Sequence, residues 1–189
     1  ETGIMDTEEL MRLFLGLAED QGAMVVCDSP LEGVERVPGG YRLRFTGLDD
    51  PVATRCVVNA AGLFADRVAA LAGIDAQAAG YRLHWFKGEY FSLARTLPPR
   101  RLIYPLPGPH GLGIHLTLDR QGRQRLGPNA FPVDTVDYEV DASHADAFYA
   151  AAHRALPDLR RSDLLPGTAG LRPKLSADGS FRDFVIAEE

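Results

Sequence analysis

The chain has 189 residues, of which 46% are hydrophobic and 24% charged, and its formal net charge is −6. This is the composition of a globular protein, long enough to form one ordinary domain or two small interleaved ones. The acidic balance and the lack of any Lys/Arg run argue against a nucleic-acid-binding surface. No apolar stretch approaches the ~20 residues that span a bilayer. An anionic substrate would therefore have to meet cations that are placed locally.

Two cysteines, Cys27 and Cys56, lie in apolar segments that look like strands. With no further partners they predict two buried free thiols rather than a disulfide bridge, and hence a reducing compartment. We therefore expect a cytoplasmic protein or one that is peripheral to a membrane. The chain opens at Glu1 rather than at a methionine and ends in a strand-like run, so we expect a segment of a longer protein.

The first part of the chain predicts alternating helices and strands. A helix begins at Asp6 or Thr7, with Glu9 placed to complete a capping box. Buried strands and a second helix follow, interrupted by a hairpin around residues 38–40. The expected elements are a strand at 23–27, hairpin strands at 34–37 and 41–45, a strand at 53–59 and a helix at 63–72. Helices that alternate with buried strands are typical of a mostly parallel α/β sheet.

From about residue 81 the pattern changes to short aromatic-rich strands between Pro/Gly loops, which predicts an antiparallel sheet. The expected strands are 81–86, 90–93, 102–106, 113–118 and 124–127, followed by a helix at 143–155 and final strands at 170–175 and 184–187. Such an insert usually forms a substrate wall beside a cofactor domain. The overall fold class is thus α/β, or α+β when both parts are counted.

Small residues follow the predicted strand at 53–59, where Ala60, Ala61 and Gly62 lead into a helix. A turn of this kind lets the backbone approach a ligand at the edge of a sheet. An ordinary tight turn with nothing bound explains the pattern equally well.

Polar residues in the later strands could carry chemistry. Arg172 and Lys174 share one face of a strand and could clamp a carboxylate, or they could be solvated charges on an edge strand that contains Pro173. His115 shares a strand face with Thr117 and could act as a base, or it could be a structural hydrogen-bonding residue.

Two further residues are weaker candidates. Tyr104 offers a phenol that could orient a substrate, or it could simply pack in the core or lie on the surface. Lys87 offers a cation, or a salt-bridge partner for Glu89. The histidines show no metal-ligand spacing, so no metal site is expected.

Six motifs in order resemble the D-amino-acid-oxidase-like FAD-dependent oxidoreductases, most closely the L-2-hydroxyglutarate oxidase/dehydrogenase branch. They are Asn-Ala-Ala-Gly-Leu-Phe-Ala-Asp (59–66), Phe-Lys-Gly-Glu-Tyr-Phe (86–91), Leu-Ile-Tyr-Pro-Leu-Pro (102–107), Gly-Ile-His-Leu-Thr (113–117), Leu-Gly-Pro-Asn (126–129) and Gly-Leu-Arg-Pro-Lys (170–174). The resemblance implies a partial FAD-binding domain in residues 1–76 and 163–189, and an antiparallel substrate-binding domain in residues 77–162.

The same resemblance implies oxidation of a small 2-hydroxy acid by hydride transfer to FAD, with oxygen or a quinone as electron acceptor. Leu31, Ala60, Ala61 and Gly62 would contact FAD. The residues that would face the substrate or the flavin are Lys87, Tyr104, His115 and Arg172, with Thr117 and Lys174 as further substrate-binding residues. We assign Arg172 as the carboxylate clamp and His115 as the base.

The chain departs from this family because it lacks the glycine-rich phosphate loop and the later glycine-rich flavin-contacting stretch. We therefore expect the isolated chain to bind little FAD and to be inactive, and the predicted function is that of the parent protein. The alternatives are an amino acid, sarcosine or glycerol phosphate as substrate on the same scaffold, or a non-catalytic binding domain. Exposed sheet edges would allow the chain to self-associate.

Overall fold

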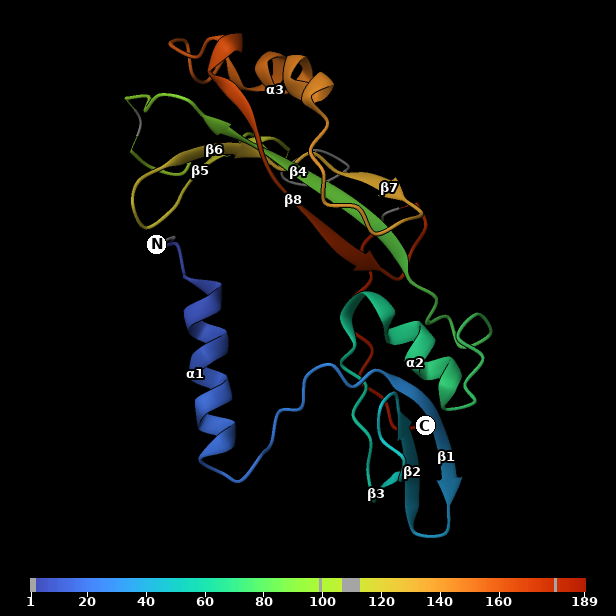
Figure 1. Ribbon diagram of the computed structural model, residues 1–189. Helices are drawn as coiled ribbons and strands as arrows, with labels where there is room; N and C mark the ends of the chain where they lie inside the picture. The colour runs from blue at the N-terminus through green and yellow to red at the C-terminus, as the bar shows by residue number, and fades with distance from the viewer. Residues whose placement is uncertain (1–2, 99, 107–112, 179) are drawn as a thin grey trace. The chain divides into compact units, whose positions relative to one another are not determined.

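The computed structural model describes residues 3–98, 100–106, 113–178 and 180–189, and Figure 1 shows its elements. The chain forms two compact units. Unit 1 comprises Glu1–Leu10 and His84–Ser180, and unit 2 comprises Met11–Leu83 and Phe181–Glu189. Both units combine helices with sheets, so the mixed α/β class predicted from the sequence is confirmed.

Unit 1 contains a five-stranded antiparallel sheet built around the long strand β4 (His84–Leu93). One edge of β4 pairs with β6 (Gln124–Gly127) and β7 (Phe131–Val133), and β6 pairs in turn with β5 (His115–Leu118). The other edge of β4 pairs along its length with β8 (Leu164–Lys174). This pairing is the reason that residues 163–180 belong to unit 1, although the sequence had grouped them with residues 1–76.

The antiparallel sheet predicted for this region is confirmed, with changes in the strand limits. The expected strands 81–86 and 90–93 form the single strand β4. Residues 102–106 contribute only an isolated bridge between Ile103 and Leu116.

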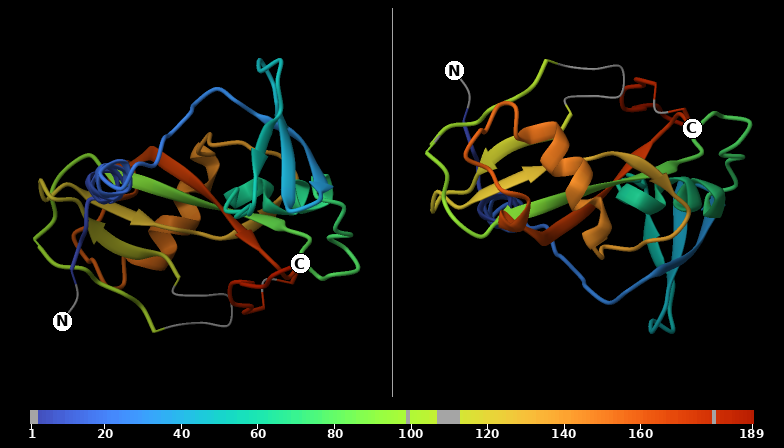
Figure 2. Two further views of the ribbon diagram at one scale, coloured as in Figure 1. Left: turned by 90° about the horizontal axis from the view of Figure 1, so that it is seen from below. Right: turned by 90° about the horizontal axis from the view of Figure 1, so that it is seen from above.

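Helix α3 (Ala145–Ala152) covers one face of this sheet and contributes Ala145, Phe148 and Ala152 to its core. Figure 2 shows the helix lying across the strands. Phe148 and Ala152 are buried on the predicted apolar face, and the Phe148 ring lies 4.7 Å from that of Phe91 in β4. Leu116 and Leu126 complete the contact from β5 and β6. Burying a side chain the size of Phe148 stabilises the fold by about 1.5–3 kcal/mol.

Unit 2 contains a small antiparallel sheet and a short helix. Strands β1 (Leu31–Val37) and β2 (Gly40–Phe45) form the hairpin predicted around residues 38–40, and β3 (Val52–Thr54) adds a third strand. Gly40 is required where β2 meets β3, because a Cβ there would lie 2.1 Å from the carbonyl oxygen of Thr54. A 3₁₀ turn (Gly62–Phe64) leads into α2 (Ala65–Leu71), close to the predicted helix at 63–72.

The strands expected at 23–27 and 184–187 are not formed, and the strand expected at 53–59 is reduced to β3. Met24, Val58 and Ile186 are 88%, 84% and 95% exposed. An extended segment needs a neighbouring strand to bond its backbone, and the described residues provide none for these segments. The mostly parallel sheet is therefore not confirmed, since every strand pairing in the described part of the chain is antiparallel. Cys27 and Cys56 are free as predicted but exposed rather than buried.

Helix α1 (Thr7–Glu19) begins as the sequence predicts, since Oδ1 of Asp6 accepts hydrogen bonds from the N–H groups of Glu8 and Glu9, both at 3.1 Å. Its predicted apolar stripe is not buried, because Phe14 and Leu17 are 60% and 53% exposed. Within the described residues no helix is both long and apolar enough to cross a membrane.

Candidate functional site

The face of the unit 1 sheet that points away from α3 carries most of the predicted substrate residues. Side chains alternate between the two faces of a strand. Leu116, Leu126 and Phe91 face α3, so the alternate residues on β5, β6 and β4 face the other way. We call this second side the open face. It carries His115, Thr117, Arg125 and Tyr90.

Gly127 shapes the middle of the open face. It pairs with His115 across the β5–β6 hairpin, and a Cβ at this position would lie 2.6 Å from Cδ1 of Tyr90. Any larger residue would collide with the Tyr90 ring. The glycine therefore allows an aromatic ring to lie against β6, next to His115.

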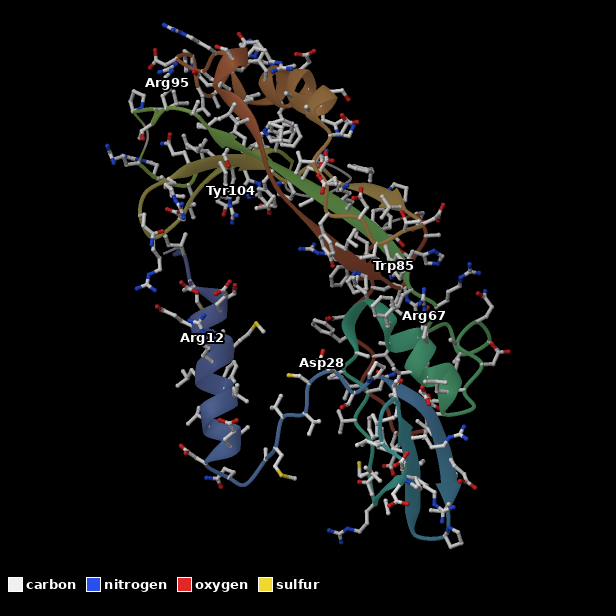
Figure 3. The ribbon with its side chains drawn as sticks, in the orientation of Figure 1. Arg12, Asp28, Arg67, Trp85, Arg95 and Tyr104 are labelled. Atoms are coloured by element: carbon white, nitrogen blue, oxygen red, sulfur yellow. The ribbon has the colours of Figure 1, made fainter. Side chains whose placement is uncertain are left out.

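His115 is held by a ring stack and by one hydrogen bond. Its ring centroid lies 4.5 Å from that of Tyr104, with an angle of 28° between the planes, and Figure 3 shows Tyr104 on the side of the sheet away from α3. Nδ1 lies 2.9 Å from the carbonyl oxygen of Gly113. A carbonyl oxygen only accepts, so Nδ1 is the donor in this contact and Nε2 is the ring nitrogen left to act as a base. The structure thus brings together two of the predicted catalytic residues and fixes the basic atom of His115, which is 8% exposed.

Arg125 and Tyr90 complete this part of the open face, and sequence reasoning missed both. The guanidinium carbon of Arg125 lies 4.7 Å from the centroid of the Tyr90 ring, and its Nε donates to Oγ1 of Thr117 at 3.2 Å. The signal that could have found Arg125 is the hairpin around residues 119–123, which pairs it with Thr117. Thr117, predicted to bind substrate, contacts Arg125 in this structure.

Arg172 and Lys174 reach the same face from β8. Arg172 pairs with Phe86 of β4 and Lys174 pairs with His84. Phe86 and His84 alternate with the β4 residues that face α3, so they lie on the open face. Nζ of Lys174 lies 4.4 Å from the centroid of the Phe86 ring. In this register His115 lies level with Tyr90 of β4, and Arg172 lies level with Phe86, four residues away along that strand. The two residues are also three strands apart, because His115 is on β5 and Arg172 is on β8. That separation is about 13 Å along the strands and about 14 Å across them between Cα atoms. A small acid could touch both residues only where their side chains extend toward one another.

Lys87 does not join this group, because it lies on the face that α3 covers. Its Nζ is 2.6 Å from Oδ2 of Asp137 and 3.9 Å from Oε1 of Glu89, so it is the salt-bridge partner that the sequence allowed as an alternative. The hydrogen bond from Lys87 is the first cause that lowers the pKa of Asp137. Lys87 is 5% exposed and its charge is matched by carboxylates.

Glu89 is the centre of this buried ion cluster. The carboxylate accepts from Asn129 Nδ2 at 2.9 Å and from the Asp141 N–H at 3.1 Å, and it lies 2.5 Å from Nδ1 of His144. Burial by itself raises the pKa of Glu89, but these hydrogen bonds outweigh it and hold the pKa below its usual value. The cluster connects β4 to the segment before α3. Its charged groups form hydrogen bonds and ion pairs with one another.

The predicted cofactor residues lie in unit 2. Ala60 and Ala61 are exposed, and Gly62 opens the 3₁₀ turn with φ 57° and no atom within 4 Å of where its Cβ would be. Asn59 fixes this turn, because Nδ2 donates to the Ala65 carbonyl at 2.7 Å and Oδ1 accepts from the Ala61 N–H at 3.3 Å. Leu31 is the partly buried first residue of β1. An exposed backbone with only small side chains suits close approach by a flat cofactor such as FAD.

Known proteins are similar to this chain in sequence and in fold. L-2-hydroxyglutarate dehydrogenase, mitochondrial, from Arabidopsis thaliana is 36% identical over 147 residues, which cover 70% of this chain and 30% of that protein. The Homo sapiens protein of the same name is 26% identical over 235 residues, covering 98% of this chain and 50% of that protein. The chain thus spans half or less of the length of these relatives.

Solved structures share the fold. L-alpha-glycerophosphate oxidase from Mycoplasma pneumoniae, solved with FAD bound, matches with a TM-score of 0.72 and 23% identity over 88% of this chain and 44% of that one. Glycine oxidase from Geobacillus kaustophilus matches with a TM-score of 0.62 and 22% identity over 86% of this chain and 40% of that one. The model of one family, the FAD-dependent oxidoreductases called DAO, matches residues 1–189. The chain therefore belongs to the DAO family of FAD-dependent oxidoreductases.

Proposed function

We propose that the whole protein oxidises a small 2-hydroxy acid of the L-2-hydroxyglutarate class, using FAD as hydride acceptor. One observation carries the proposal: His115, with its proton fixed on Nδ1, shares a sheet face with Arg172, a cation suited to a carboxylate. A hydroxyl group beside a carboxylate is the substrate feature that such a pair would recognise. The 36% identity to a plant protein named L-2-hydroxyglutarate dehydrogenase supports the same substrate class.

His115 acts as the base in this proposal. Its Nε2 takes the hydroxyl proton of the substrate as the C–H bond at the same carbon breaks, a role typically worth ~10²–10⁴-fold in rate. The Nδ1–H bond to the Gly113 carbonyl keeps the ring from turning and stabilises the imidazolium that forms. Tyr104 holds the other side of the ring and offers its hydroxyl to the substrate.

Arg172 binds the carboxylate next to the reacting carbon through a charge-assisted pair of hydrogen bonds. Lys174 adds positive charge from the same strand face. Bound FAD supplies the acceptor for the hydride, and residues 60–62 and Leu31 are the positions in this chain that we expect to contact it. Oxygen or a quinone would then accept the electrons.

The test is the visible spectrum of the full-length parent protein before and after anaerobic addition of L-2-hydroxyglutarate. We expect a flavin spectrum that bleaches with this acid. A flavin that stays oxidised with the acid but bleaches with glycine, sarcosine or glycerol phosphate would reject the substrate class and keep the family chemistry. A protein that cannot be reconstituted with FAD would reject the oxidation altogether and favour a binding role.

A further inference from the structure

We infer that Arg125 is a specificity residue that binds the second, distal carboxylate of a dicarboxylic 2-hydroxy acid. The inference deepens the proposed function, on which its catalytic part rests, by setting the length and charge of the substrate. It starts from a guanidinium group that is held in place on the open face yet has no anionic partner in the described residues.

Arg125 is fixed by two contacts. The Tyr90 ring supports one face of the guanidinium, and Thr117 Oγ1 accepts from its Nε. Gly127 makes the first contact possible, because only a residue without a side chain leaves room for the Tyr90 ring. Both contacts leave the two terminal amino groups of the guanidinium available, and their planar pair of donors matches a carboxylate.

The charge of Arg125 has no ion-pair partner among the described residues, whereas several other arginines of unit 1 pair with carboxylates. Arg95 pairs with Asp163, Arg120 with Glu9, and Arg123 with Asp119. No carboxylate among the described residues forms an ion pair with Arg125 or with Arg172. In a chain of net charge −6, an arginine without a carboxylate partner on this sheet face favours an anionic ligand.

The position of Arg125 suits the far end of a five-carbon acid. It lies one strand and two residues from His115, about 8 Å between Cα atoms. The end carbons of a five-carbon chain are about 5 Å apart, from C–C bonds of about 1.5 Å. An acid with its hydroxyl at His115 could therefore place its distal carboxylate at Arg125, whereas a short monocarboxylic acid would not reach Arg125.

The experiment compares the full-length protein with its Arg125→Gln variant on L-2-hydroxyglutarate and on L-2-hydroxybutyrate, which lacks the second carboxylate. We expect kcat/KM for the dicarboxylate to fall by about 10–100-fold, mostly through KM, and that for the monocarboxylate to change by less than about threefold. Arg125→Lys should recover part of the loss because it restores the charge without the planar fork. Arg123→Gln is the matched control, since it removes the same charge two residues away from a side chain already paired with Asp119.

A second readout needs no turnover. Calorimetric binding of glutarate and of butyrate to the same proteins should show the same selective loss of glutarate affinity in Arg125→Gln. Equal losses for both ligands, or no loss beyond that of Arg123→Gln, would overturn the inference even if the enzyme oxidises L-2-hydroxyglutarate. If the parent oxidises neither acid, the proposed function fails, and the glutarate-to-butyrate comparison still decides whether Arg125 binds a distal carboxylate. Thermal unfolding of each variant shows whether a loss comes from misfolding.

Discussion

The two faces of the unit 1 sheet are built from the same strands but serve different purposes. On the α3 face, Lys87 and Glu89 form ion pairs with neighbouring groups, and the apolar residues pack against one another in the core. On the open face, Arg125 is positioned by Tyr90 and Thr117 yet has no carboxylate partner in the described part of the chain. A charged residue in a family motif is thus not a site residue by type alone. What matters is whether its hydrogen-bonding capacity is already used within the fold.

The largest expected effect on the open face comes from His115→Gln. Because Gln cannot accept a proton, kcat for L-2-hydroxyglutarate should fall by about 10²–10⁴-fold, while KM changes little. Stopped-flow measurement of flavin reduction under anaerobic conditions checks this. Arg123→Gln, at an arginine that pairs with Asp119, is the control, and a His115→Gln enzyme that reduces its flavin at the normal rate would remove His115 as the base.

On the α3 face the largest expected effect is on stability. Phe148→Ala removes a fully buried ring that packs on Phe91, and should cost about 3–5 kcal/mol of unfolding free energy. Urea unfolding measures the loss. Tyr149→Ala, at the next and only partly buried position of α3, should cost clearly less, and equal losses would contradict the packing described here.

The ion cluster around Glu89 should make the folding stability of unit 1 fall in acid. The pKa of Glu89 is lowered in the folded state, so the unfolded state binds the proton more tightly and stability rises with pH through this range. The contribution of Glu89 is present above its unfolded pKa and is lost as pH falls through the lower folded pKa. Glu89→Gln should lose about 1–3 kcal/mol near pH 7 and flatten the acid side of the stability profile. Unfolding curves between pH 7 and pH 3 measure both effects, and a variant that keeps the wild-type slope would show that Glu89 is not the group responsible.

The smallest expected effect distinguishes Arg172 on the open face from Lys87 on the α3 face. Arg172→Gln should raise KM about tenfold for both monocarboxylic and dicarboxylic 2-hydroxy acids, because it removes the partner of the carboxylate that they share. Lys87→Gln should leave KM within about twofold and lower the unfolding temperature instead, because its partners are Asp137 and Glu89. Steady-state kinetics and thermal unfolding of the two variants test this, and the reverse pattern would assign Lys87 to the substrate.

Part of each unit could be predicted from the sequence because the signals are local. Alternating residues and turn glycines indicated the β1–β2 hairpin and the strand at 124–127, and helical spacing placed Phe148 and Ala152 on one face of α3. The apolar runs at 23–27 and 184–187 were misjudged. Their strand-like composition is real, but a buried strand also needs partners on both sides, and composition carries no information about those.

The candidate site was also predicted only in part from the sequence. The sequence by itself determined that His115 and Thr117 share one face, as do Arg172 and Lys174, because alternation within a strand is a property of the backbone. Only the tertiary structure decided that β8 pairs with β4 in the register that puts both pairs on one face. The same register puts Lys87 on the opposite one. Register is set by contacts between residues far apart in the sequence, such as Phe86 and Arg172, and a one-residue slip would exchange the two faces of a strand.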